Sequence, residues 1–183
     1  MYPYTLPHKI ANDGEELTFE AIEYEDGERK LIVSNLIQPK QGPPFHVHFK
    51  QDEYLQVKSG RMGYQIYGEE AQVIGEGESV LFKRNQMHRF WNDGEHPLVC
   101  TGWVMPANSL DYFLTGVYNS MNKANNLKGD PFDSAFLLTR YKSEYDLLDV
   151  PPFVKKVIMP ITVFIGKLLG KYEHFQDAPE PLK

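Results

Sequence analysis

Short runs in which apolar and polar residues alternate make up much of the first hundred residues. Residues 17–25 form one such run, and the Asp26-Gly27 pair that follows it is a strong hairpin signal. Residues 29–38 form the returning run, and residues 97–105 follow a second Asp-Gly pair. Alternation with a period of two is typical of a half-buried strand. The repeated short strands and turns predict a β-barrel or a pair of packed sheets.

After the last of these strands, the apolar positions change to helical spacing. Asn108 is expected to cap a first helix, because asparagine is a favoured residue at that position. Asp130 and Pro131 predict the start of a second helix, since proline is favoured in the first turn. The apolar positions of this second helix continue to Leu148.

A third helical stripe covers residues 154–172, and Pro160 within it is expected to kink or split the helix. The chain is therefore divided into a barrel at 1–105 and a C-terminal helical extension at 106–183. An apolar helix face needs a partner surface. We expect the extension to pack on the barrel or on a partner subunit.

The third helix also raises the question of a membrane. Its uninterrupted apolar stretch is residues 157–166, ten residues between Lys156 and Lys167. A bilayer span needs about 20 residues, so we expect no membrane span. Flanking lysines are compatible with an anionic lipid surface. We favour packing with the lysines pointing outward, which leaves peripheral membrane contact as the weaker alternative.

Charge is distributed unevenly along the chain, whose formal net charge is −6. Residues 1–105 carry 16 acidic residues against 10 Lys and Arg, whereas residues 106–183 carry 9 of each. Nucleic-acid binding requires clustered basic residues for phosphate contacts. The acidic barrel region therefore argues against a nucleic-acid partner.

Cys100 is the single cysteine of the chain, so no internal disulfide is possible. Nothing adjacent to it would lower the pKa of its thiol, so we interpret it as a buried apolar residue and not as a nucleophile. The first residues are neither basic nor followed by an apolar run. A reducing cytoplasm is the expected location.

Candidate chemistry is concentrated at residues 46–53 and at position 88. His46 and His48 are two residues apart in an extended run, so both imidazoles should point to the same side of a strand. Glu53 follows after four residues that indicate a turn, and His88 lies in another strand-like segment. Imidazoles and a carboxylate that converge are ligands for a divalent transition metal. His8, His96 and His174 lie outside this pattern.

These residues also carry a family resemblance. The first stretch reads His46-x-His48-x4-Glu53-x6-Gly60, and the second reads Gly77-x5-Lys83-x-Asn85-x2-His88-x3-Asn92. Both are similar to the two motifs of cupin barrels, and the chain resembles small single-barrel metal-binding cupins of the quercetin-dioxygenase-like kind. The resemblance covers about residues 15–105. It implies a mainly β fold, an antiparallel double-stranded β-helix or jelly-roll barrel, here with a C-terminal α-helical extension.

Three positions depart from the cupin motifs, and none of them is a ligand. Lys40 stands where the first motif has its leading glycine. Lys83 and Asn85 stand where the second motif has its proline and its inner glycine. Asparagine tolerates a left-handed backbone conformation. We therefore expect the turn at Asn85 to be preserved.

The expected cofactor is one divalent transition metal held by His46, His48, Glu53 and His88. Fe, Mn, Ni, Co and Zn all suit three imidazoles and a carboxylate, so the identity of the metal stays open. A purely structural zinc site is disfavoured, because such sites are usually rich in cysteine and closed. Four protein ligands leave an octahedral metal two open positions.

Strand parity gives a set of candidates for a substrate pocket. Residues two and four positions from an inward-facing ligand should also face inward. The candidates from this rule are Leu55, Val57, Phe90 and Asn92. Tyr64 is a further candidate, from a strand whose inward face the pattern does not fix. Such a lining suits a small, largely apolar or aromatic molecule. It fits a sugar phosphate poorly, since phosphates need cationic side chains.

The sequence leaves two classes of function open. The first is a metal enzyme, specifically a dioxygenase-type oxidoreductase, because the resemblance includes enzymes whose metal binds substrate and dioxygen together. The second is a non-catalytic module that binds or senses a small molecule. Cupins carry several chemistries, so fold does not choose between them. Since similar barrels often pair through their sheets, we also expect a homodimer.

Overall fold

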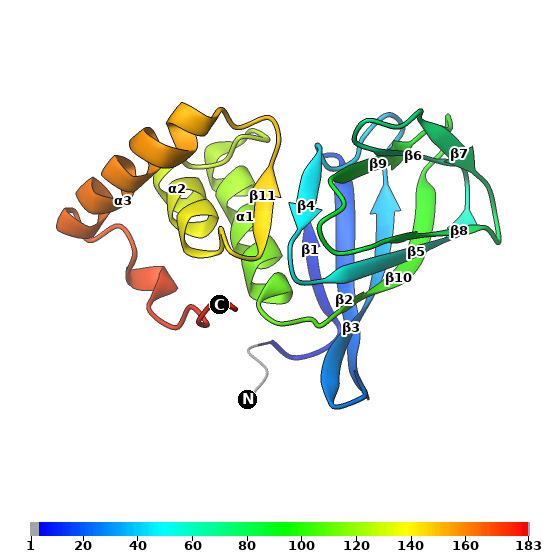
Figure 1. Cartoon of the computed structure of the whole chain (residues 1–183), viewed down its shortest axis with the longest axis horizontal. Coiled ribbons are helices and arrows are strands. Elements are labelled where there is room, and N and C mark those ends of the chain that lie inside the picture. Colours follow the sequence, from blue (N-terminus) through cyan, green and yellow to red (C-terminus); the bar gives the residue numbers. More distant parts are fainter. Residues whose placement is uncertain (1–3, 183) are drawn as a thin grey trace.

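Two antiparallel sheets face each other in the barrel, and helices cover one side of it (Figure 1). The structure is a computed structural model that describes residues 4–182. The first sheet has the order β1 (His8–Ala11), β2 (Glu15–Glu25), β3 (Glu28–Ile37), β10 (Leu98–Met105), β5 (Asp52–Ser59), β8 (Ser79–Phe82). The second has the order β11 (Tyr145–Leu147), β4 (His46–His48), β9 (His88–Asn92), β6 (Met62–Ile66), β7 (Gln72–Ile74). This arrangement confirms the predicted mainly β jelly-roll fold with C-terminal helices.

The helical segments follow β10 and carry the chain away from the barrel. They are α1 (Leu110–Ala124), α2 (Pro131–Arg140), η1 (Val154–Ile158), α3 (Met159–Leu168) and η2 (Glu173–Phe175). Among residues 4–182, no helix combines the length and the hydropathy that crossing a bilayer requires.

Two clusters of buried apolar side chains hold the fold together. One fills the space between the two sheets and includes Leu55, Phe82, Phe90 and Cys100, so Cys100 is buried as predicted. The other joins strands of the barrel to the helices and includes the residues Phe19, Leu31, Val104, Leu110, Leu137, Tyr141 and Phe175. Burial of such side chains is worth roughly 1.5–3 kcal/mol each. Helices α1 and α2 and the turn η2 are therefore fixed to the barrel within the chain, while the domain boundary at residue 105 stays a prediction.

The second helix is shorter than predicted, which is a correction to the sequence interpretation. It ends at Arg140, although apolar positions at helical spacing continue to Leu148. Residues 145–147 instead form β11, which pairs with β4. A short apolar run reads as helix or strand from its spacing alone, and the free edge of β4 decides the outcome here.

The start of the first helix also differs from the prediction. Ser109 occupies the N-cap position and makes no side-chain capping bond. Asn108, the predicted cap, has a left-handed backbone (φ 37°) and its amide donates to Glu144. By contrast, α2 begins at Pro131 as expected, and Asp130 caps it by accepting from the backbone N–H groups of Phe132 and Asp133.

Pro160 marks a change of helix type. The wide π-helical turn η1 runs directly into α3, with Pro160 in the first turn of α3. Proline lacks the N–H that would bond to the carbonyl four residues earlier, and its ring would clash there. The third helix is not split at Pro160, because residues 154–168 stay helical without a break, and the expected effect of the proline is limited to the change from π-helix to α-helix.

The motif turns keep the backbone geometry that glycine normally supplies. Gly60 and Gly77 have φ of 93° and 84°, which few other residues adopt without strain. Asn85 has φ of 69°, as predicted for this turn, and Lys40 has φ of 64°. Lys40 and Asn85 therefore adopt the left-handed backbone conformation that glycine would otherwise supply at these two positions.

Candidate metal centre

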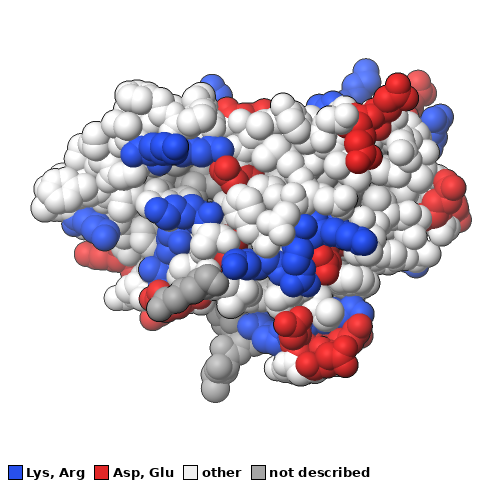
Figure 2. Space-filling model, in the orientation of Figure 1, with Lys and Arg blue, Asp and Glu red and all other residues white. Residues whose placement is uncertain are grey.

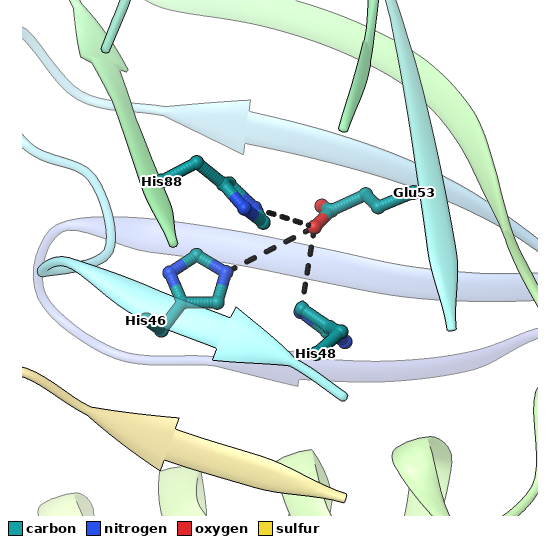
Figure 3. Close-up of side chains that lie close together, drawn as sticks. All are labelled: His46, His48, Glu53 and His88. Atoms are coloured by element: carbon teal, nitrogen blue, oxygen red, sulfur yellow. Dashed lines mark hydrogen bonds and ion pairs between the residues drawn. The ribbon is translucent and has the colours of Figure 1, made fainter. Parts of the chain in front are cut away.

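Four side chains from two facing sheets meet inside the barrel (Figure 3). His46 and His48 come from β4, and His88 lies opposite His46 on the neighbouring strand β9. Glu53 comes from β5 in the other sheet. The two histidines of β4 point to the same side because they are two residues apart. The structure thus brings together all four residues that the sequence singled out, and their binding of a metal stays a prediction.

The four donor groups have the spacing of ligands around one ion. The Nε2 atoms of His88, His48 and His46 lie 3.1, 3.4 and 3.9 Å from Oε2 of Glu53. One ligand atom from each residue can be chosen so that all lie within 4.8 Å of one another. Two atoms that each lie about 2.1 Å from a metal are separated by about 3–4 Å. The cluster is therefore able to hold a single metal ion.

Backbone carbonyls orient two of the imidazoles. Nδ1 of His46 donates to the carbonyl oxygen of Pro44 and Nδ1 of His88 donates to that of Gln86, both at 2.9 Å. A carbonyl only accepts, so each Nδ1 carries a proton and Nε2 is the ring nitrogen that faces the centre. Without a metal, each Nε2 can bond to the carboxylate of Glu53 only by donating a proton to it. A divalent cation between Nε2 and the carboxylate takes the place of those protons, so the donor set fits a metal.

The surroundings of His48 and Glu53 set the protonation of these two groups. Burial lowers the pKa of His48 to about 3, so this ring is neutral at neutral pH. Burial alone would raise the pKa of Glu53, but hydrogen bonds from His46 and His88 hold that pKa well below its usual range. Neutral imidazoles and an ionised carboxylate are the forms that bind metals.

Aromatic and aliphatic side chains surround the centre on the inside of the barrel. Phe82 is the strand partner of Glu53 and stacks on His88, with ring centroids 3.9 Å apart. Three of the predicted pocket residues are buried in the same apolar cluster, namely Leu55, Val57 and Phe90. Their inward orientation agrees with the prediction from the alternation of residues along β5 and β9. Phe82 was missed, because no local pattern shows which residue lies opposite Glu53.

The remaining two pocket candidates lie differently. Tyr64 is half-buried beside Phe82, and its hydroxyl donates to Gln72 at 2.7 Å. Asn92 is four residues from His88, roughly 13 Å along the strand. Its amide donates to the carbonyl oxygens of Ile37 and His96, and its side-chain oxygen accepts from Gly94. The structure does not bring Asn92 to the histidines.

A buried carboxylate of the helical region supports the segment that leads to Glu53. Glu144 is fully buried and accepts from Gln51, at 2.9 Å, and from Asn108, Ser109 and Tyr145. Gln51 also donates to the hydroxyl of Tyr145 at 3.2 Å. No local pattern indicates this cluster, because its members come from segments that are distant in the chain.

A buried polar pair, Asn35 and Glu15, was also not predicted from the sequence. Asn35 is buried in β3 and donates to Glu15 of β2. Burial raises the pKa of Glu15, and the charge of Glu53 raises it further. Both residues lie on strands whose other inward-facing positions are apolar. Alternation along β2 indicates that Glu15 shares a face with Leu17 and Phe19, which was the available signal.

Comparison with known proteins shows which protein family the barrel region matches. Residues 35–104 match a family model described as a cupin domain. The four candidate ligands all lie within the matched residues.

Curated relatives are similar over more of the chain. The oxidoreductase iacF of Pestalotiopsis fici is 31% identical over 137 residues, covering 68% of this chain and 62% of the relative. The probable oxidoreductase virH of Hypocrea virens is 30% identical over 107 residues, covering 54% of this chain and 48% of the relative. The chain thus matches less than two thirds of the length of these relatives.

Among solved structures, one similar protein is an uncharacterized conserved protein with a double-stranded β-helix domain from Klebsiella pneumoniae subsp. pneumoniae. It is 22% identical, with a TM-score of 0.44, over 54% of this chain and 82% of that chain.

Proposed function

Because this chain is a member of the cupin superfamily, we propose that it is a metal-dependent oxidoreductase acting on a small, largely apolar or aromatic molecule. In this proposal His46, His48, Glu53 and His88 hold one divalent metal. The observation that carries it is the convergence of three Nε2 atoms on the Glu53 carboxylate inside the barrel. Relatives named as oxidoreductases support the reaction class.

Different side chains have different roles at such a site. A bound divalent transition metal supplies Lewis-acid or one-electron chemistry. Glu53 offsets part of the charge, and the carbonyl-oriented rings of His46 and His88 keep their donor atoms aimed at the centre. Phe82 and Phe90 exclude water from the inner side. An apolar wall of this kind favours a substrate that has a flat or apolar body.

A dioxygenase-like reaction, similar to that of quercetin-dioxygenase-like cupins, is the specific form that we propose. The test is oxygen uptake by protein loaded anaerobically with Fe(II) and then mixed with phenolics and diketones. Uptake that depends on one of these compounds and falls strongly in Glu53→Gln supports the proposal. The matched control is His96→Ala, since His96 is an exposed histidine outside the cluster.

Two results would point elsewhere. Compound-dependent uptake that is unchanged in Glu53→Gln would place the chemistry outside this cluster. Tight binding of a compound to the metal-loaded protein without any oxygen uptake would favour the alternative, a non-catalytic binding or sensing module.

A further inference from the structure

The outward face of η1 and α3 is a continuous apolar surface. Leu168, Phe153 and Phe164 are 72%, 65% and 63% exposed. The full set, called the α3 face below, is Phe153, Val157, Ile158, Ile161, Phe164, Ile165, Leu168 and Leu169. Exposed apolar side chains at this density are uncommon on a protein surface and indicate a partner.

The opposite side of the same helix is firmly seated, so the exposure of the α3 face is not due to loose packing. Gly166 is buried, and a Cβ atom placed there would come within 2.3 Å of the hydroxyl oxygen of Tyr172. Tyr172 in turn packs on Phe136 of α2, with ring centroids 4.9 Å apart. The helix therefore presents its apolar side to the outside in a fixed orientation.

The charge around the α3 face differs from that of the rest of the chain. Residues 150–172 contain four lysines and no acidic residue, a net charge of +4 between Asp149 and Glu173, and one of these lysines, Lys155, pairs with Asp146 at 2.7 Å. The formal net charge of the whole chain is −6, so the residues outside this segment carry a net charge of −6 − 4 = −10. Lys156, Lys167 and Lys171 are exposed. In Figure 2, the area where α3 lies is mostly uncharged, and the charged atoms beside it are mainly blue.

We propose that the α3 face binds the surface of a membrane that contains anionic lipids. A helix that combines exposed aromatic and aliphatic side chains with lysines, and lacks acidic residues, suits insertion into the headgroup region. The helical run from η1 through α3 covers residues 154–168, about 22 Å at 1.5 Å per residue. It would lie in the plane of the membrane, since a span needs about 20 apolar residues.

A second copy of the chain is the other occupant to consider. Pairing two α3 faces across a two-fold axis would bring the lysines of one copy close to those of the other. Like charges at a desolvated contact oppose association, whereas anionic headgroups neutralise them. The charge pattern therefore favours lipid over self-association at this face.

Vesicle flotation of the full chain tests the proposal, with phosphatidylcholine vesicles with and without phosphatidylserine. We expect binding to the anionic vesicles that weakens with salt. Phe164→Ser/Leu168→Ser should abolish it. Lys156→Gln/Lys167→Gln/Lys171→Gln should lower it roughly 100-fold, since each lysine near an anionic surface is worth roughly fivefold in partitioning.

Two matched controls change similar exposed residues on the barrel. These are Tyr24→Ser/Leu81→Ser and Lys40→Gln/Lys58→Gln/Lys83→Gln. Both should bind like the unmodified chain. Absence of binding to anionic vesicles, equal binding to neutral ones, or equal loss in the controls would overturn the proposal. So would light scattering that shows a dimer which Phe164→Ser/Leu168→Ser converts to a monomer.

Discussion

Tyr145, which follows the second helix, is the strand partner of His48, a candidate metal ligand. The ring of Tyr145 also meets the imidazole of His48 edge-on, with centroids 5.4 Å apart. One residue earlier, Glu144 holds Gln51, which is two positions before Glu53. The helical region thus contacts both β4 and the segment leading to β5. It forms part of the frame of the candidate metal centre.

The first prediction concerns this frame. Glu144→Ala removes the acceptor of Gln51, Asn108, Ser109 and the backbone N–H of Leu182. A buried donor left without a partner costs about 1–3 kcal/mol, so the free energy of unfolding should fall by about 3 kcal/mol or more. Chemical denaturation of the metal-free protein measures this change.

Glu180→Ala is the matched control for Glu144→Ala. Glu180 is exposed and pairs with Arg140 at the surface. Exposed ion pairs are worth about 0–1 kcal/mol. Equal losses of stability in the two variants would contradict a special role for Glu144.

The second prediction concerns the C-terminal residues. Deletion of residues 151–183 removes Phe175, which is buried in the cluster shared by barrel and helices, and the bond from Leu182 to Glu144. Burial of one such side chain is worth roughly 1.5–3 kcal/mol. Thermal melts and light scattering should show a less stable, aggregating protein. An unchanged melt with clean behaviour in solution would indicate a detachable tail.

The third prediction concerns the thiol of Cys100. Burial raises its pKa from 9.0 to about 12. The thiol should therefore be unreactive toward alkylating reagents at pH 8 in the folded protein and reactive in denaturant. Because the folded form holds this proton more tightly than the unfolded form, its contribution to stability is present below pH 9 and is lost as pH rises toward 12.

Cys100→Ser tests whether the alkaline loss belongs to this thiol. The variant should show a smaller decrease in the free energy of unfolding between pH 9 and pH 11 than the unmodified chain. Rapid alkylation of the native protein at pH 8 would show that the thiol is accessible and would contradict its buried position.

The sequence predicted the parts of this molecule that depend on local spacing. Parity along β5 and β9 placed Leu55 and Phe90 inside the barrel because strand faces alternate with a fixed period. The turn at Asn85 followed from the backbone conformations that asparagine tolerates.

The features that were missed depend on contacts between distant segments. Residues 145–147 have helical spacing but join the edge of β4, because an unpaired strand edge offers hydrogen bonds that the local pattern does not show. Asn108 leaves its expected capping role for a bond to Glu144. The partners of residues 145–147 and of Asn108 are distant in the sequence, so local patterns do not identify them.

Metal content tests the central claim most directly. After equilibration with each of the candidate divalent metals and removal of the excess, we expect about one metal per chain for one of them. His48→Ala or His88→Ala should remove most of it, since even changes behind the ligands weaken affinity by ~10–100-fold. His96→Ala should keep it. Full metal content in the His46→Ala/His48→Ala double variant would contradict the proposed site.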